Sequence, residues 1–529
     1  MKTISKGGFL GINNRLPDFA LHKDKVGDYL RDAINVNVTD SGHLVRRKAL
    51  SLVQALTGAH SLFGEYLVID SAIYRITLPT YSQTLVKTLT SNSRMAWHEL
   101  NGDLYYSNGI DTGRIDAAGN WTPWGLPLPA EPTVTKLPGG LPAGYYQVAV
   151  SYARYAGGTA VVNLLEEGGV SPSNNCELTS DGALRVTLPA ATVGATHINV
   201  YVSTQNGSIP MLQAVVPVGT ATVDVTAMNM GRDAVQRFEE PLPAGHRVFS
   251  FNGRLCCLAG DTLYYGLPYK PGYYDSVAGR IQFTVPVSVA IGNQSGIYVA
   301  ADKTYFIAGA DLDGEVVLRD ALPYGAVPGT EFVLPDKENM VVGWFGVKGV
   351  VLADFQGQVS PLMADTVDQT PPASGFSTVF ESGGYRRVVS CGWCVNTANG
   401  AATRYADYDL TSASGGYGTK TDGLYALEGE GDVVWSVDLG KENFGAEQLK
   451  RMPAVYLGCS SDAPLELRVQ TPQHDYTYPA RSCSDALQEH RVDPGKGLRA
   501  NWFNLSLQGE SDFTLASVSF APVASTRRI

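Results

Sequence analysis

The feature that most constrains the fold is a short strand–turn–strand unit that recurs along the chain. Its clearest copy is Phe251–Gly266, FNGRLCCLAGDTLYYG, in which Asn252-Gly253 and Gly260-Asp261 are hairpin turns between apolar runs. Weaker copies begin at Gly64, Glu99 and Trp344. Repeated hairpins of this kind are typical of a β-propeller, in which small sheets pack around an axis. About 240 residues have this character, which at about 40–50 residues a blade predicts five or six blades.

Composition favours strands and turns over helices. The 529 residues include 57 Gly, 29 Pro and 27 Tyr, which together indicate many turns and β-strands. Only residues 25–34 and 444–451 have helical character. A chain of this length is expected to hold roughly three domains. The sequence therefore predicts an all-β protein with several domains.

Changes of pattern divide the chain into five segments. Between two propeller parts, strands with a turn about every ten residues match a β-sandwich of the immunoglobulin or fibronectin type III kind. After a Gly/Ser-rich bend, alternating strands predict a second, C-terminal β-sandwich. The predicted segments are 1–53, an extended N-terminal arm; 54–130, the first part of the propeller; 131–230, the inserted sandwich; 231–409, the second part of the propeller; and 410–529, the C-terminal sandwich.

Charge and cysteine content narrow the class of protein. The net charge of -11 argues against binding nucleic acid by neutralising phosphates, although a channel through which DNA slides is compatible with it. No apolar run approaches the roughly 18 residues of a membrane span, and the N-terminus lacks the apolar core of a signal peptide. The seven Cys, an odd and scattered set, favour reduced thiols made in a cytoplasm.

Motifs for catalysis, metals or cofactors are weak. Cys391-Gly392-Trp393-Cys394 lies in a strand-like run without further ligands nearby, which favours structural cysteines over a disulfide or zinc site. Asp311-x-Asp313-Gly314 matches a calcium loop only in part and is better explained as a turn. No nucleophile-elbow, zinc-protease or phosphate-loop motif occurs, though carboxylates brought together by folding would escape this search. We therefore expect no cofactor, no metal and no enzymatic activity.

The candidate contact sites are two basic runs and one aromatic-proline loop. The first basic run suits either a solvated strand edge or a contact patch. The loop, which follows the central hairpins, suits either insertion into a neighbouring subunit or a place in a β core. The second basic run belongs to a short C-terminal tail. The residues expected at protein interfaces are Arg46, Arg47, Lys48, Tyr269, Tyr273, Tyr274, Arg527 and Arg528.

Three stretches of the chain resemble tail proteins of tailed bacteriophages. GINNRLPDF…YLRDAINVNVTDSGHLVRRKAL resembles the arm that opens many phage tail propeller proteins. GHRVFSFNGRLCCLAGDTLYYGLPYKPGYYD is similar to their central blade, and DFTLASVSFAPVASTRRI to their C-terminal sandwich. The resemblance is to hub, nozzle and tail-tip proteins. It implies a propeller with inserted β-domains that forms a ring around the DNA exit channel or closes it.

The resemblance also implies a role and a set of partners. The chain would be a structural part of the virion tail, assembled in the bacterial host cytoplasm, that forms a homo-oligomeric ring and contacts other tail or connector proteins. DNA would pass through without specific binding. Two alternatives stay open. One is a tail module that binds a host receptor or surface glycan through the sandwich at 131–230; the other, less favoured, is a glycan depolymerase.

Overall fold

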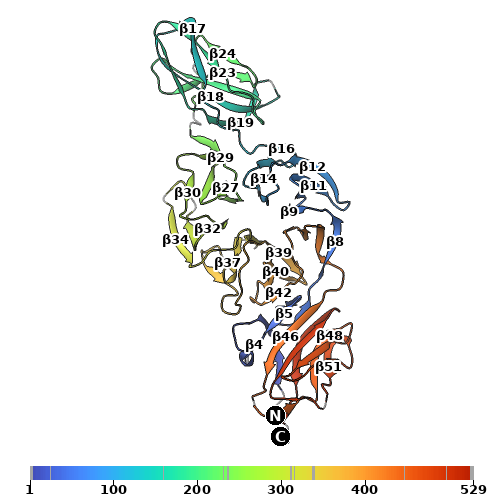
Figure 1. Ribbon diagram of the computed structural model, residues 1–529. Helices are drawn as coiled ribbons and strands as arrows, with labels where there is room; N and C mark the ends of the chain where they lie inside the picture. Colours follow the sequence, from blue (N-terminus) through green and yellow to red (C-terminus); the bar gives the residue numbers. More distant parts are fainter. Residues whose placement is uncertain are drawn as a thin grey trace.

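The computed structural model describes residues 4–524 apart from 24–25, 159, 230, 235–237, 310–311, 315, 336–339, 446 and 496. Within these residues the protein is all-β, which confirms the predicted fold class, and the one helical element is a 3-10 turn, η1 (Asp18–Ala20). Three bodies lie in a row: a sandwich at one end, a propeller in the middle, and a second sandwich that holds the first and last strands (Figure 1).

The two stretches expected to be helical form strands. Residues 25–34 contain β4 (Gly27–Leu30) and β5 (Asp32–Ile34), and residues 444–451 contain β47 (Lys450–Arg451). Segments this short hold too few apolar positions to separate a helical period from a strand period. Pairing with neighbouring strands therefore decides their structure.

The central body is a ring of seven small sheets in the described residues. Blades 1 and 2 are β9 (Ala59–Phe63), β10 (Tyr66–Ile69), β11 (Ala72–Thr77) and β12 (Ser82–Thr88), then β13 (Ala96–Leu100), β14 (Asp103–Ser107), β15 (Thr112–Ile115) and β16 (Trp121–Thr122). Blade 3 is β25 (Glu239–Pro241), β26 (Arg247–Phe251), β27 (Arg254–Ala259), β28 (Thr262–Leu267), β29 (Lys270–Asp275) and β30 (Arg280–Gln282).

The remaining four blades follow in chain order. Blades 4 and 5 are β31 (Val289–Asn293), β32 (Gly296–Ala300), β33 (Thr304–Ala308) and β34 (Val317–Leu322), then β35 (Phe332–Pro335), β36 (Met340–Gly346), β37 (Gly349–Ala353) and β38 (Val359–Pro361). Blades 6 and 7 are β39 (Ser377–Ser382), β40 (Tyr385–Ser390), β41 (Trp393–Asn396) and β42 (Ala402–Arg404), then β43 (Ser412–Ser414), β44 (Tyr417–Lys420), β45 (Gly423–Gly429) and β8 (Ala49–Ala55). Strands near the axis lie against those of the next blade, including β13 on β26, β26 on β31 and β43 on β9.

The prediction of five or six blades was too low. The last blade combines β43–β45 with β8, which pairs antiparallel to β45 and closes the ring between the seventh and first blades. These strands fall in segments that the sequence analysis gave to the C-terminal sandwich and the N-terminal arm. No local signal connects β8 to a partner so far along the chain.

The hairpins of Phe251–Gly266 form as the turn residues predict. Asn252 and Gly253 both have positive φ, 48° and 73°, as a tight hairpin turn requires, and Phe251 pairs with Arg254 across it. Cys256 and Cys257 are both buried, although successive side chains of a strand point to opposite faces of its sheet. Both faces of this blade are covered, one by each neighbouring blade.

The insert between blades 2 and 3 is a two-sheet sandwich with its own core. One sheet has the order β17-β21-β24, and the other β19-β18-β22-β23 with β20 on β18. Val148, Val150 and Ile198 are fully buried between the sheets. The strands are β17 (Thr133–Leu141), β18 (Gly144–Ala156), β19 (Val162–Val170), β20 (Asn174–Leu178), β21 (Gly182–Thr187), β22 (His197–Ser203), β23 (Pro210–Pro217) and β24 (Thr222–Val225).

The C-terminal sandwich is built from both ends of the chain. One sheet has the order β51-β48-β54-β7-β6, with β1 also on β54, and it faces β5-β46-β53-β49-β50. Besides β4, β5 and β47, the strands are β1 (Ile4–Gly7), β2 (Phe9–Ile12), β3 (His22–Lys23), β6 (Val36–Val38), β7 (Leu44–Arg46), β46 (Trp435–Glu442), β48 (Val455–Ser461), β49 (Glu466–Gln470), β50 (Asp475–Pro479), β51 (Ser484–Val492), β52 (Arg499–Ala500), β53 (Phe503–Gly509), β54 (Phe513–Phe520) and β55 (Val523–Ala524).

Residues 1–53 were expected to form an extended arm, and the described part of this segment is folded instead. Val36, Val38 and Leu44 are buried in the same core as Trp435 and Phe520. β1 pairs with β54 from Ile4↔Phe520 onward. Burial of these apolar side chains against the last strands holds the N-terminal segment in place.

One continuous sheet joins the propeller to this sandwich. Strand β5 pairs with β42 of blade 6 on one side, through Ile34↔Arg404, and with β46 of the sandwich on the other. The nine strands run from β39 to β50 without a break. Among the described residues, no helix is both long and apolar enough to cross a lipid bilayer.

Candidate interaction sites

The basic run Arg46–Lys48 is used mainly within the chain. Arg46 donates to the Asp512 carboxylate at 2.5 Å. Arg47 is 5% exposed, and its guanidinium donates to Asn35 Oδ1 at 2.8 Å and to two backbone carbonyls at 2.9 and 3.0 Å. Burial lowers the pKa of Arg47. Only Lys48 is exposed, so the expected partner contact through Arg47 is corrected to an internal one.

Two of the three loop tyrosines are also internal. Tyr273, 2% exposed, donates to Glu166 Oε1 of the insert at 2.7 Å and accepts from the Leu126 amide at 2.6 Å. Tyr274 packs edge-on against Tyr264, with ring centroids 5.2 Å apart, and burial raises its pKa to about 12. Tyr273 therefore joins the insert to blade 3, while Tyr274 packs within the propeller.

Tyr269 is the exception in this loop. Its side chain is fully exposed and its backbone has φ 62°. It stands at the rim of a cavity of about 490 Å³ between the insert and the propeller. We call this cavity the junction pocket; it is lined among others by Tyr105, Arg114, Trp124, Arg154, Lys270 and Tyr273. Arg527 and Arg528 lie outside the described residues.

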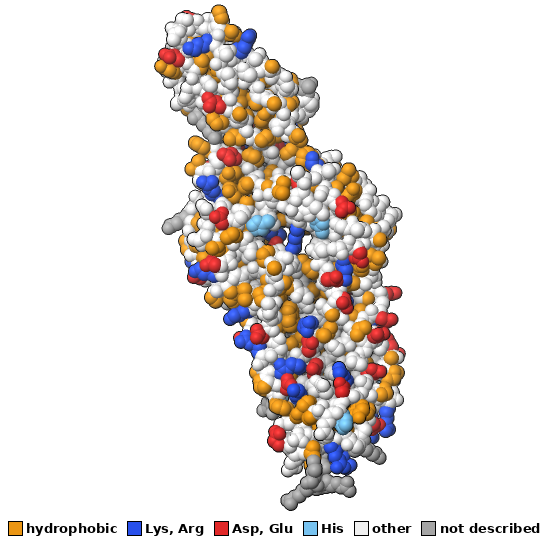
Figure 2. Space-filling model, viewed as in Figure 1, with side chains coloured by type: hydrophobic (Ala, Val, Ile, Leu, Met, Phe, Trp, Pro, Cys, Tyr) orange, Lys and Arg blue, Asp and Glu red, His pale blue; other side chains and the backbone are white. Residues whose placement is uncertain are grey.

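A second cavity, of about 580 Å³, lies on the propeller axis. Figure 2 shows a hollow there with charged and His side chains around it. Arg247 pairs with Glu331 at 3.1 Å, and Arg94 donates to the Gly329 carbonyl at 2.9 Å. Burial, reinforced by the charge of Arg247, lowers the pKa of His98 to about 4. His98 is therefore neutral at pH 7, and two guanidiniums face one carboxylate.

A third cavity, of about 740 Å³, lies between blade 6 and the C-terminal sandwich. Asp32 and Asp438, which line it, are direct partners across the β5–β46 pair. Burial raises the pKa of Asp438, with a further contribution from Asp32. Paired carboxyls in a cavity are an arrangement that acid–base catalysis uses. Sequence reasoning missed this pair because cross-strand pairing brings together residues far apart in the chain.

The cysteine motif has no disulfide. Cys391 and Cys394 are both free, as are the other five cysteines. Cys394 is buried and its Sγ lies 3.6 Å from Asn37 Oδ1; burial raises the pKa of both thiols. Among the described residues, no three His, Cys, Asp or Glu side chains gather as metal ligands would. Asp311 lies outside the described residues, and Asp313 pairs with Arg254.

Comparison with known proteins finds similarity to solved structures only, at low identity. No protein-family model and no curated protein matches it. A solved exo-beta-1,3-galactanase from Phanerochaete chrysosporium is similar at 10% identity and a TM-score of 0.19, over 90% of this chain and 100% of that one. The N-terminal domain of Nup159 is similar at 10% identity and a TM-score of 0.24, over 76% of this chain and 94% of that one.

A third similar structure is a glycoside hydrolase family 43 arabinoxylan arabinofuranohydrolase from Bacillus subtilis. It shares 10% identity at a TM-score of 0.20, over 64% of this chain and 93% of that one. Glycoside hydrolases are among these similar structures, and the expectation that this chain is not an enzyme is therefore withdrawn. The likeness itself assigns no reaction to this chain.

Proposed function

We propose that this chain is a structural component of a bacteriophage virion tail, a hub, nozzle or tail-tip protein that forms a ring around the DNA exit channel or closes it. The observation that carries the proposal is the use of the N-terminal segment: β8 closes the propeller, while β1, β5, β6 and β7 complete the C-terminal sandwich. One segment thus fastens two bodies, which suits a part that must keep its shape under load.

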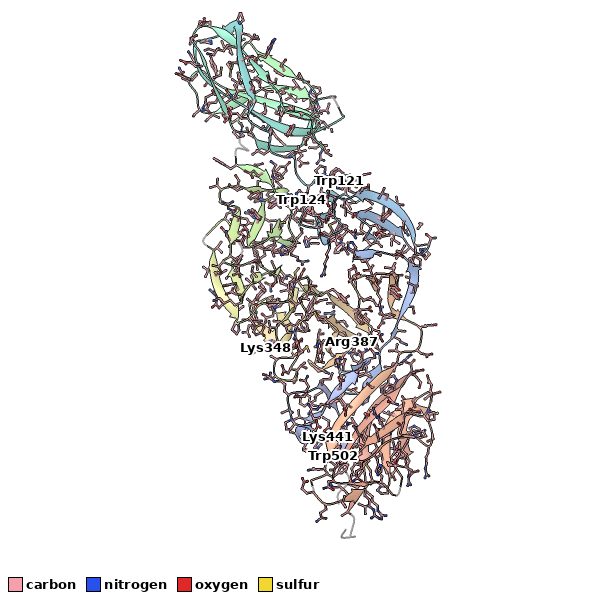
Figure 3. All side chains as sticks on the ribbon, in the orientation of Figure 1. Trp121, Trp124, Lys348, Arg387, Lys441 and Trp502 are labelled. Carbon is pink, nitrogen blue, oxygen red and sulfur yellow. The ribbon has the colours of Figure 1, made fainter. Side chains whose placement is uncertain are left out.

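The sheet through β5 supports the same role. Hydrogen bonds run from blade 6 across β5 into the sandwich, so bending at this junction would break paired backbone groups rather than swing a linker. The buried Arg387 adds a side-chain contact across it, donating to the Val38 carbonyl at 3.1 Å. Arg387 is labelled in Figure 3, close to the junction.

Shape and charge support assembly around DNA. The insert and the C-terminal sandwich stand at opposite ends of the propeller (Figure 1), so each copy has two separate bodies for contacts with neighbours in a symmetric ring. The net charge of -11 would repel DNA from the wall of a conduit. The partners would be further copies and other tail or connector proteins, assembled in the host cytoplasm.

Size measurement of the purified full chain tests the proposal. Light scattering after gel filtration, with negative-stain microscopy, is expected to find a closed ring of several copies. An antibody against the chain is expected to label the tail of phage particles. A chain that stays monomeric at all concentrations, together with particles whose tails are unlabelled, would overturn the proposal.

A further inference from the structure

Tyr269 combines a positive backbone φ with a side chain that packs on nothing. It lies in the turn between β28 and β29 at φ 62°, a region that a bulky side chain rarely occupies. Its side chain is 100% exposed, so it gains no burial in return. Residues held in sparsely populated backbone conformations cluster at active sites and ligand clamps.

The cavity beside Tyr269 is built before any ligand arrives. Its volume of about 490 Å³ falls within the roughly 300–1,000 Å³ of small-ligand pockets, which favour domain junctions. Trp124 and Tyr273 line it and are buried. Trp124 Nε1 donates to the Leu242 carbonyl at 3.1 Å, and the Tyr273 hydroxyl is fixed by two hydrogen bonds. Figure 3 places Trp124 at this seam.

The charged groups that line the junction pocket are mostly cations. They are Arg114, Arg154 and Lys270 against one carboxylate, Glu166, which pairs with Arg154. Arg114 and Lys270 remain 28% and 29% exposed at their side chains while paired with carboxylates outside the lining. They are therefore held in place and still reachable, and a guanidinium can bind a second carboxylate or a phosphate through its free donors.

We infer that the junction pocket binds an acidic saccharide. The exposed ring of Tyr269 offers a flat apolar face for a sugar ring, and Arg114 and Lys270 offer charge to its carboxylate or phosphate substituent. This site lies at the seam between the insert and the propeller and uses residues of both, whereas the sequence suggested glycan recognition through the sandwich at 131–230 alone. It goes beyond the proposed tail role and does not depend on ring formation.

Ligand-observed NMR on the full chain tests the inference. The probes are glucuronate, galacturonate, N-acetylneuraminate and digalacturonate, with glucose and galactose as neutral counterparts. At least one acidic probe is expected to bind about tenfold more tightly than the neutral sugars. One charge-assisted hydrogen bond is enough to produce a difference of this size. Tyr269→Ala is expected to weaken that binding about tenfold. Arg114→Gln is expected to weaken the binding of the acidic probes and to leave the binding of the neutral sugars unchanged.

Tyr145→Ala is the matched control. Tyr145 is 59% exposed on the insert but does not line the pocket, so this variant is expected to bind like the wild type. Binding by none of the acidic probes, or equal binding by Tyr269→Ala, would overturn the inference. So would loss of ring assembly in Tyr269→Ala, because Tyr269 would then serve a protein contact. Rings that form normally without saccharide binding would reject this site alone and leave the tail role standing.

Discussion

The guanidinium of Arg47 lies 5.3 and 5.6 Å from the centres of two tyrosine rings, Tyr405 and Tyr408. It donates to Asn35, in the turn between β5 and β6, and to the Ala406 carbonyl after β42. Arg47 therefore joins the N-terminal segment to blade 6 close to the point where β5 pairs with β42. Its neighbour Lys48 points to solvent, so two adjacent cations have opposite roles.

Replacing Arg47 tests this internal role. Arg47→Ala is expected to lower the free energy of unfolding by about 3 kcal/mol, because buried acceptors lose a charged donor. Lys48→Ala, its neighbour, is expected to stay within about 0.5 kcal/mol of the wild type. Denaturant unfolding measures both. Equal effects from the two variants would contradict the assignment of Arg47 to the interior.

His98 on the propeller axis is expected to make stability depend on pH. Its folded-state pKa of about 4 lies below the ordinary value of 6.5, so between these values the unfolded chain binds more protons. Stability therefore falls as pH decreases from about 6.5 to 4, by up to about 3 kcal/mol from this residue. Unfolding of the wild type and of His98→Gln between pH 4 and 7 measures the effect. An unchanged slope in the variant would count against it.

At the scale of the elements, the strand pair β8–β45 that closes the ring leaves no room for a side chain at Gly423. A Cβ at Gly423 would lie 2.5 Å from the Gln54 carbonyl oxygen and 2.6 Å from Leu52 Cδ1. Any side chain there must push the two strands apart. Because no other strand closes this blade in the described residues, the ring opens between blades 7 and 1 when they separate.

Gly423→Ala is expected to cost about 2 kcal/mol of stability, in the range of overpacked sites. Hydrogen exchange should rise in β43–β45 before it rises elsewhere. Gly497→Ala is the control, since a Cβ there meets nothing within 4 Å and its φ is not left-handed; it should change stability by less than about 0.5 kcal/mol. Uniform exchange across the blades of Gly423→Ala would show that β8 does not act as the closure.

What the sequence could predict at this scale depended on how local the signal was. Asn252-Gly253 identified its hairpin because the turn needs only two residues of a particular kind. The partner of β8 could not be found, because its apolar alternation fits any half-buried strand edge. Nor could the sequence tell Tyr269 from Tyr273, two tyrosines four residues apart. Only the packing of the insert on blade 3 makes the first ring exposed and the second buried.

At the scale of the whole molecule, the three bodies differ in how firmly they are joined. The C-terminal sandwich shares a sheet with blade 6 and strands with the N-terminus. The insert has a separate core and meets the propeller through a seam of a few side chains, among them Tyr273 and Glu166. Removal of the insert and removal of the N-terminal segment should therefore have different effects on folding.

Replacing residues 131–230 by a short Gly-Ser linker is expected to leave a soluble chain that unfolds cooperatively, at a cost of about 1–3 kcal/mol for the lost seam contacts. Removing residues 1–53 is expected to abolish folding, because both the sandwich and the ring lose strands. Gel filtration and thermal unfolding separate the two cases. A folded chain without residues 1–53 would restore the view of this segment as an arm.

The meeting of both chain ends in one sandwich has a consequence during synthesis. Ser5 of β1 hydrogen-bonds Ser519 of β54, 514 positions later, so β1 leaves the ribosome long before the strand that it pairs with has been made. Unpaired strand edges invite association with other chains. A product truncated before β54 therefore cannot complete this sandwich.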